Sequence, residues 1–374
     1  MVGKVYFARM NKERNAIALM TLVDLPGIGP QTIKKILEKS NQMDDLFNLS
    51  KRRLMHEFNL PESQAKTIAE AKQFDQSKVR YESINAAGVT ITAWNDPDYP
   101  RRLLRCNDAP VLLYGKGNRI WNAPRTVAVV GMRQASEYGK RMCKKIVQEM
   151  VPYNPVIISG LAFGIDITAH RTALKTGLKT MACLAHGLDI VYPSAHAKEA
   201  RLMQETGMVC SEHELGVKPD RVNFPLRNRL IAGMADVVVV VESTIKGGSM
   251  LTAKLAHSYH RDVMAVPTRV GDEKGEGCFE LIQHHLGSLI TGGDDVARFM
   301  NWDISQPVQQ TELLFDLNEH EKDVLRLLSN EDLHIDDLTN RFKSTRGDLM
   351  VTLFKMELSN LVRGLKGSRW TRVG

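Results

Sequence analysis

Four short segments combine glycine with hydroxyl-bearing or cationic residues, a pattern typical of phosphate-binding loops. They are residues 131–136 (GMRQAS), 159–166 (SGLAFGID), 223–229 (NFPLRNR) and 246–249 (KGGS). Glycine lets the backbone approach a phosphate closely, and the N–H groups at the start of a helix favour an anion. Arginine and lysine add charge, and arginine adds a forked pair of donors. The four segments together predict a site for a phosphate-bearing ligand.

Such loops need a scaffold that brings them together, and the surrounding sequence predicts one. Apolar, β-branched runs at 126–130, 156–159, 181–184, 237–241 and 263–266 alternate with amphipathic helical stretches. Near-continuous valine and isoleucine runs indicate strands buried on both faces of a parallel sheet. We therefore predict an α/β, Rossmann-like, doubly wound domain with a mostly parallel sheet, whose ligands bind beyond the carboxyl ends of the strands. Each loop alone could be an ordinary glycine turn, but several at one edge favour a phosphate-binding cleft.

Three regions are expected along the chain. Residues 1–80 form short helices and are predicted to be a helical domain of the SAM or helix–hairpin–helix kind. Residues 81–300 form the extended Rossmann-like domain, and residues 312–374, after a polar linker, form a winged helix. The turn at 25–30 (LPGIGP) could present backbone N–H groups to DNA phosphates, or it could serve structure or a protein contact.

The composition bears on the protein's partners, on the cellular compartment in which it resides and on whether it binds a metal. Lys and Arg outnumber Asp and Glu by 50 to 43, and the net charge of +7 favours polyanionic partners only weakly. Five scattered cysteines without a CxxC pair, and histidines without ligand spacing, favour a reducing cytoplasm and no metal site. The N-terminal residues have no apolar signal-peptide run, and the apolar run at 237–241 is too short to span a bilayer. We expect a cytoplasmic protein without a cofactor.

The loop sequences also indicate which phosphate compound binds. The chain has no GxxxxGK[ST] motif and no GxGxxG after its first strand, which argues against an ATP-hydrolysing loop and a dinucleotide. Phe163 could stack on a nucleic-acid base, an interaction of about 1–3 kcal/mol in single-strand binders. Neither Arg133 nor Arg227 lies in an apolar run, so we expect both to be unburied and to hold phosphates. Asp166 and Glu242 could be an acid–base pair, but a carboxylate at such positions more often caps a helix or orients an arginine.

Several ordered motifs resemble those of one known family. SGLAFGIDITAH, GLDIVYP, NFPLRNRLIAG and KGGSMLTAKLA occur in the order found in the DprA/Smf family of DNA-processing proteins. The chain is identified as a member over residues 95–291, although Met132 and Phe163 stand where the family usually has serine and arginine. The loops and the resemblance together name these candidate DNA-binding residues: Gly131, Arg133, Ser159, Gly160, Phe163, Gly164, Asp166, Arg227, Asn228, Arg229, Lys246, Gly248 and Ser249.

The resemblance implies a function. It implies a homodimer that binds single-stranded DNA through the Rossmann-like domain, protects incoming DNA and loads the RecA recombinase. It further implies that this serves competence, natural transformation and DNA recombination, with no reaction catalysed. Apolar residues near the end of the domain either form the dimer surface or fill the domain's own core. They are Leu281, Ile282, Leu286, Leu289 and Ile290.

Two other functions remain as alternatives. A nucleotide-processing hydrolase of the PGGxGTxxE type would share the Rossmann-like frame, but Lys254 stands where its catalytic glutamate should be. A regulatory module would act through the winged helix, whose third helix is mixed in charge. The terminal hairpin carries four basic residues that favour either a DNA contact or a solvated surface. They are Arg363, Lys366, Arg369 and Arg372.

Overall fold

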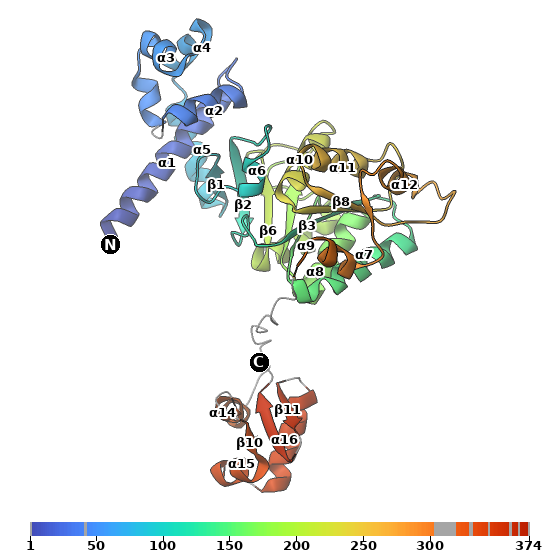
Figure 1. Cartoon of the computed structure of the whole chain (residues 1–374). Helices are drawn as coiled ribbons and strands as arrows, with labels where there is room; N and C mark the ends of the chain where they lie inside the picture. The colour runs from blue at the N-terminus through green and yellow to red at the C-terminus, as the bar shows by residue number, and fades with distance from the viewer. Residues whose placement is uncertain are drawn as a thin grey trace. The chain divides into compact units, whose positions relative to one another are not determined.

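The structure is a computed structural model of the 374-residue chain. It describes residues 2–40, 43–302, 319–328, 332–342, 345–358, 361–365 and 367–372. The chain divides into two compact units, residues 1–303 and residues 304–374 (Figure 1).

A nine-stranded sheet forms the centre of the first unit, with the strand order β1-β2-β6-β5-β4-β3-β7-β8-β9. The strands from β3 to β9 run parallel to one another, whereas β1 and β2 are antiparallel additions at the β6 edge. The strands are β1 (Thr90–Ala93), β2 (Leu112–Gly117), β3 (Thr126–Gly131), β4 (Val156–Ser159), β5 (Thr180–Leu184), β6 (Met208–Ser211), β7 (Val237–Val241), β8 (Asp262–Ala265) and β9 (Ser288–Leu289). All five predicted strands are present, which confirms the doubly wound, Rossmann-like class.

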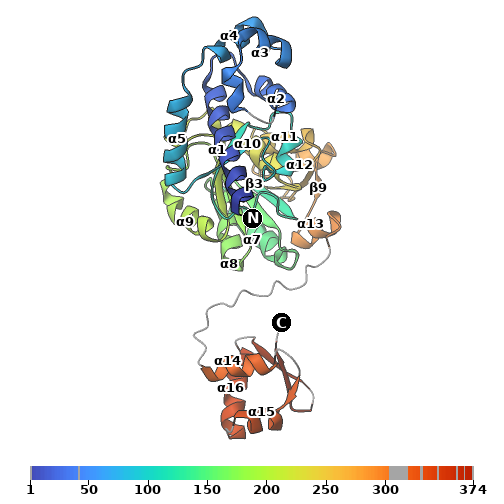
Figure 2. The ribbon, with the colours of Figure 1, turned by 90° about the vertical axis from the view of Figure 1, so that its left-hand side faces the viewer.

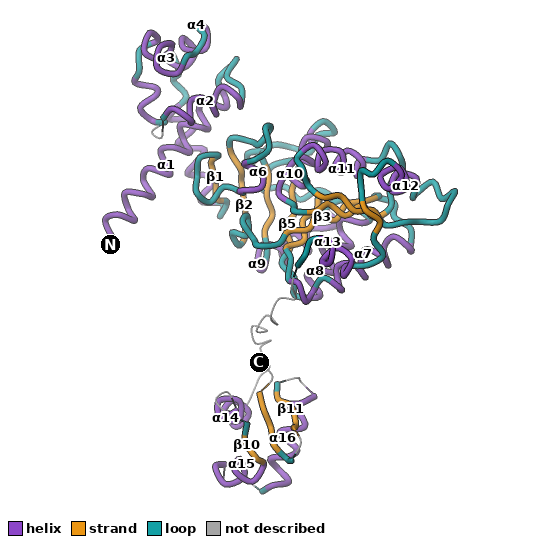
Figure 3. Tube along the Cα trace, in the orientation of Figure 1, coloured by secondary structure: helices purple, strands orange, loops and turns teal. Residues whose placement is uncertain are grey.

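Helices cover both faces of this sheet, as Figure 3 shows. Strand β3 sits at its centre: Val127 and Val129 pack into one core, and Ala128 and Val130 into another. The first core takes residues of α7 (Glu137–Glu149), α8 (Ile165–Thr176) and α13 (Gly293–Phe299). The second takes residues of α6 (Arg101–Leu104), α10 (Asn223–Met234), α11 (Gly248–Ser258) and α12 (Glu276–Gln283). Helix α9 (Ala197–Thr206) packs on β5 and β6, and the short 3₁₀ turns η2 (Val151–Tyr153) and η3 (Ser194–His196) lie in connections.

The N-terminal helices share a core with the sheet. They are α1 (Val2–Asp24), α2 (Pro30–Lys39), η1 (Asp44–Asn48), α3 (Lys51–Phe58), α4 (Glu62–Ala69) and α5 (Phe74–Ala86). Leu19 and Leu22 of α1 belong to the same buried cluster as Ile91 and Leu112 of the edge strands. Helix α5 lies beside α1 (Figure 2) and continues past the expected boundary at residue 80.

Polar contacts tie these helices to the sheet region. Arg80 of α5 donates to Glu214 at 2.8 and 2.7 Å and also pairs with Asp24. Gln31 and Lys34, on the helix that follows the 25–30 turn, donate to the carbonyl of Asn107 at 3.0 and 3.1 Å. The second helix of the expected hairpin is therefore used for an internal contact.

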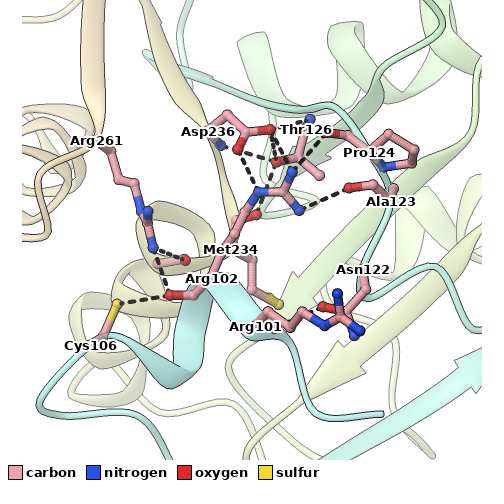
Figure 4. A network of polar contacts seen from close by, with 11 residues as sticks. Arg101, Arg102, Cys106, Asn122, Ala123, Pro124, Thr126, Met234, Asp236 and Arg261 are labelled. Carbon is pink, nitrogen blue, oxygen red and sulfur yellow. Dashed lines mark hydrogen bonds and ion pairs between the residues drawn. The ribbon is translucent and has the colours of Figure 1, made fainter. Parts of the chain in front are cut away.

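An arginine network closes the amino ends of the two central strands (Figure 4). Arg102 binds Asp236 through two hydrogen bonds, from Nε at 2.6 Å and from Nη2 at 2.8 Å. Asp236 also accepts from the backbone of Thr126 at 2.9 Å, and Arg261 donates to the carbonyl of Arg102 at 2.6 Å. Bidentate arginine–carboxylate pairs are strong and directional. This network fixes α6, β3 and β7 together at the edge opposite the predicted site.

The second unit is a small three-helix domain with a three-stranded sheet of order β10-β12-β11. Its elements are α14 (Glu319–Leu328), β10 (Leu333–His334), α15 (Ile335–Phe342), α16 (Arg346–Leu358), β11 (Val362–Leu365) and β12 (Arg369–Arg372). Val324, Leu338, Leu353 and Trp370 form its core. The winged helix stays a prediction, and the hairpin between β11 and β12 turns at Gly367 as predicted. Lys366 and the side chain of Arg372 lie outside the described residues.

Candidate nucleic-acid interface

The first two predicted loops interlock at the carboxyl ends of β3 and β4. Gly164 has φ +76°, and a Cβ atom there would lie 2.1 Å from the carbonyl oxygen of Met132. Ile165, the first residue of α8, donates its N–H to the same oxygen at 3.2 Å. Gly131 is equally crowded, because its Cβ would lie 2.0 Å from the carbonyl oxygen of Val241. The glycines therefore let these loops pack tightly against each other, and no larger residue fits.

Arg133 lies on the exposed surface of this assembly. Its Cζ atom lies 5.4 Å from the ring centre of Phe224, the second residue of α10. Phe224 in turn packs against Tyr192 at 5.8 Å between ring centres. Arg133 is thus held on the ring of Phe224 by a cation–π contact and stays open to solvent.

Phe163 supplies a further exposed ring. Half of its surface is exposed, and its ring meets His196 edge-on at 4.8 Å between centres. His196 is buried and its Nδ1 pairs with the carbonyl of Leu161 at 2.8 Å. The sequence singled out Phe163 for stacking, but it did not single out Tyr192 or Phe224, although both lie in motifs that it quoted.

Arg227 is buried, which corrects the expectation that it is accessible to phosphate. Only 4% of its surface is exposed, and its guanidinium group donates to the carbonyls of Gly160, at 2.7 Å, and Cys183. Burial lowers the pKa of Arg227, which the nearby Asp166 carboxylate partly offsets. The arginine therefore joins α10 to the ends of β4 and β5. Its sequence surroundings do not distinguish this role from an exposed one.

The other two residues of the Arg-Asn-Arg run also bind protein groups. Arg229 pairs with Glu212 and donates to the carbonyl of Asp108, and its side chain is 16% exposed. Asn228 accepts from Arg227 at 3.2 Å and donates to the carbonyl of Gly248 at 3.3 Å. This run therefore connects the third and fourth loops, and of the three predicted arginines only Arg133 is exposed.

The two candidate acid–base carboxylates are both engaged by loop backbone. Asp166 is buried and accepts from the N–H groups of Gly160 at 3.2 Å and Ala162 at 3.4 Å. Burial raises the pKa of Asp166, although Arg227 acts in the opposite direction. Glu242 accepts from the backbone of Ser136 at 2.8 Å and from its hydroxyl. Both carboxylates therefore hold the backbone of a loop that leads into a helix.

The remaining predicted residues divide by exposure. Ser159 is fully buried and donates to the carbonyl of Val129 at 2.6 Å, and Ser249 is buried and donates to Ser243 at 2.7 Å. Lys246 and Gly248 are exposed. The predicted loops therefore offer a ligand the exposed Arg133, Phe163, Lys246 and Gly248, with buried polar residues beneath them. The half-buried members of the predicted set are Gly131, Gly164, Asn228 and Arg229.

A groove of about 690 Å³ continues from this surface between α7 and α8. Arg133, Phe163 and Gly164 line it where the two helices begin. Five of its lining residues are Arg or Lys, and none is Asp or Glu: Arg133, Lys140, Lys144, Arg171 and Lys175. The four helical cations were not predicted, because exposed lysines on an amphipathic helix resemble any solvated face.

Similarity to known proteins identifies the family. A sequence model of DNA recombination-mediator protein A matches residues 90–301, more than half of the chain. The chain belongs to this family, DprA/Smf. Protein Smf of Synechocystis sp. is 38% identical over 200 residues, which cover 52% of this chain and 50% of that protein. DNA processing protein DprA of Streptococcus pneumoniae is 41% identical over 201 residues, which cover 54% of this chain and 71% of that protein. The match to the Synechocystis relative thus spans half of its length.

Solved structures of DprA proteins have the same fold. The X-ray structure of Streptococcus pneumoniae DprA matches with a TM-score of 0.61 and 32% identity, covering 77% of this chain and 99% of that one. DNA processing protein A from Helicobacter pylori matches with a TM-score of 0.53 and 27% identity, covering 57% and 97% respectively. The DprA/Smf motifs of this chain therefore lie on the family's fold.

Two features are absent from the described residues. None of the helices there combines the length and the apolarity that a membrane span requires. Nor does that part of the chain bring three His, Cys, Asp or Glu side chains together as metal ligands.

Proposed function

We propose that this DprA/Smf chain binds single-stranded DNA at the carboxyl edge of its sheet. The observation that carries the proposal is the exposed arrangement of Arg133 beside aromatic rings, at the glycine-rich loops. A guanidinium group can fork two hydrogen bonds to one phosphate, and an exposed ring can stack on a base. The structure of Helicobacter pylori DNA processing protein A describes a single-stranded DNA binding mode, which supports the same ligand here.

A single strand fits this edge better than a duplex. The rings of Phe163 and Tyr192 are about half exposed, and a base must be unstacked to lie on them. Contacts to phosphate and to the faces of bases carry little sequence information. Binding is therefore expected to prefer single strands, to tolerate any sequence and to weaken strongly with salt.

We further propose that the chain catalyses no reaction. Asp166 and Glu242 hold loop backbone, and Lys254 occupies the position where the rival nucleotide hydrolase has its glutamate. Lys254 is exposed and carries no carboxylate, so the position lacks the acid that such a hydrolase uses.

RecA is the proposed recipient of the bound strand. The family is that of DNA recombination-mediator protein A, and the resemblance implies that the strand is protected and passed to RecA during natural transformation. Binding through phosphates and the faces of bases makes no contact that depends on base sequence, so any strand can be bound and then passed to RecA. The RecA contact itself is proposed on the family resemblance alone.

Three measurements test the proposed function. Fluorescence anisotropy with labelled single-stranded and duplex oligonucleotides should show tighter binding of the single strand at the same salt concentration. Incubation with nucleoside monophosphates, nucleoside triphosphates and DNA should release no product, and assembly of RecA on single-stranded DNA should accelerate when the protein is added. Tight, sequence-specific duplex binding, or turnover of a nucleotide, would overturn the proposal.

A further inference from the structure

We propose that single-stranded DNA leaves the sheet edge along the groove between α7 and α8, so that the strand follows a helix-lined track as well as the loops. This inference rests on the proposed function and extends its site. The groove is continuous with the candidate interface, because Arg133, Phe163 and Gly164 line both. It reaches Gln148 and Lys175 at the far ends of the two helices.

The cations of the groove form two rows. Lys140 and Lys144 lie one helical turn apart on α7, and Arg171 and Lys175 lie one turn apart on α8. Four residues of an α-helix rise about 6 Å along the axis, so each row offers charge at regular intervals. A regularly charged flexible polyanion can meet such rows repeatedly, whereas a small phosphate compound would use only one position.

Two of the four helical cations form ion pairs within the protein, and the other two do not within its described part. Lys140 pairs with Glu137 at 2.8 Å, and Arg171 pairs with Glu199 at 2.7 Å. Lys144 and Lys175 are exposed, and neither forms an ion pair within the described part of the chain. Among the four described cations of the two helical rows, these two lysines are therefore the unpaired ones, and they lie beyond the loops that the family motifs identify.

The floor of the groove suits a nucleic-acid backbone. Thr168 and Thr172 of α8 lie there with Ile167, and both hydroxyls donate to helix carbonyls at 2.7 Å. The floor is thus small, uncharged and already satisfied, so it neither repels phosphate nor requires a specific polar partner. A track of this kind binds through charge and is indifferent to sequence.

The test is the dependence of binding on oligonucleotide length in the full chain. The variant carries Lys144→Gln and Lys175→Gln. Its matched control carries Arg141→Gln and Lys179→Gln, two exposed cations near the same helices that do not line the groove. Each protein is titrated with oligothymidylates of about 6 and about 20 nucleotides, lengths at the short end and beyond the site of one single-strand module.

The groove variant should bind the short oligonucleotide like the wild type and the long one about tenfold more weakly. Its salt slope for the long oligonucleotide should fall by about 1.4, which is about 0.7 for each lost cation on a single strand. The control should bind both lengths like the wild type. All three proteins should unfold at the same temperature, because the replaced side chains are exposed.

Three results would overturn the inference, each with a different meaning. If the groove variant and the control bind the long oligonucleotide equally, the strand does not follow α7 and α8, while the proposed function stands. If the wild type binds neither length, the proposed function fails as well. If polyglutamate binds the wild type but not the groove variant, and long-oligonucleotide binding is unchanged, the groove serves an acidic protein segment.

Discussion

The guanidinium group of Arg227 occupies the space that a side chain at position 160 would need, because a Cβ atom on Gly160 would lie 2.5 Å from Nη1 of Arg227. The two residues are 67 positions apart, and the same Nη1 donates to the carbonyl of Gly160 at 2.7 Å. One arginine thereby fixes the shape of the loop that ends β4. The arginine can take this position only because residue 160 is a glycine, and the glycine's carbonyl is in turn bound by the arginine.

This relationship predicts coupled stabilities. Arg227→Ala should lower the free energy of unfolding by about 1–3 kcal/mol, because two buried carbonyls lose their donor. Gly160→Ala should cost about 1–3 kcal/mol through overpacking. The double variant should cost less than the sum, because the methyl group enters the space that the arginine vacates. Urea unfolding of the four proteins measures this cycle, and strict additivity would contradict the proposed contact.

Arg133 should behave differently from Arg227. Arg133→Ala removes an exposed fork, so the fold should remain intact while single-strand affinity falls about tenfold and the salt slope flattens by roughly one phosphate. Arg133→Lys should restore only part of the affinity, because lysine lacks the planar fork. Anisotropy titrations at several salt concentrations, beside a thermal melt, would measure both effects. Unchanged affinity in a folded Arg133→Ala protein would remove this residue from the site.

The rings of Phe163 and Tyr192 should stabilise bound DNA by stacking on its bases, beyond the apolar surface that they bury. Phe163→Ala and Tyr192→Ala should each weaken single-strand binding by about 1–3 kcal/mol, the usual value for one stacked base. Phe163→Tyr and Tyr192→Phe keep a ring and should bind like the wild type, whereas leucine at either position should not restore binding. Titration with an abasic oligonucleotide is the second readout. If the alanine variants lose the same affinity on abasic DNA, the rings do not stack on bases.

A buried histidine should make the fold sensitive to acid. Burial lowers the pKa of His170 to about 3, while its Nδ1 pairs with Thr180 at 2.7 Å. The unfolded chain binds a proton at about pH 6.5 and the folded one does not, so stability is full above that pH and falls as the pH drops toward 3. The histidine alone should remove about 2 kcal/mol between pH 7 and pH 5.

His170→Gln tests this dependence. It should flatten the decline between pH 7 and pH 5 relative to the wild type, measured by denaturant unfolding at each pH. Burial also lowers the pKa of His186 and of His213, so both variants should keep some dependence in the same direction. An identical slope in wild type and variant would show that His170 is not the source.

Homodimerisation remains a prediction, and the structure divides the five apolar residues named for it. Leu281 and Ile290 are buried in the chain's own core, Ile282 and Leu286 are half-buried, and Leu289 is 53% exposed on the edge strand β9. Leu289→Lys should weaken self-association at micromolar concentration and leave the fold intact, as measured by sedimentation velocity. Leu281→Lys is the contrasting variant and should unfold the domain. A monomer at every concentration, with and without DNA, would contradict the dimer.

The sequence predicted the architecture because buried parallel strands have a distinctive composition. The five valines of β7 are fully buried, and a run of that kind is rarely anything else. Strand β6 was missed, because its four residues (MVCS) are too short and too mixed to stand out. The antiparallel pair β1 and β2 is also absent from the five strands predicted from apolar runs. Its place at the sheet edge depends on pairing with β6, which no local pattern records.

The site was predicted less completely than the fold. The glycines where the loops cross were predicted because only glycine fits such close backbone contacts. Arg133 and Arg227 are of the same residue type in similar loops and differ only in burial. Tyr192 and Phe224 are brought to Arg133 by tertiary packing. The groove cations come from two helices whose relative placement is set by the sheet. The sequence thus identified the charged, aromatic and glycine residues of the site, but it did not show which of them are exposed and which are buried.

The N-terminal helices and the edge strands share one hydrophobic core, so the helices do not form a separate domain. Leu19 and Leu22 close over Ile91, Leu112 and Tyr114 in one continuous interior. The segment that matches the family model begins at residue 90, so the helices lie outside it and yet cover part of its apolar face. A DprA/Smf protein without such helices must either carry polar residues at the positions of Ile91 and Leu112 or cover them with another segment. Removing the helices from this chain would therefore expose Ile91, Leu112 and Tyr114 to solvent.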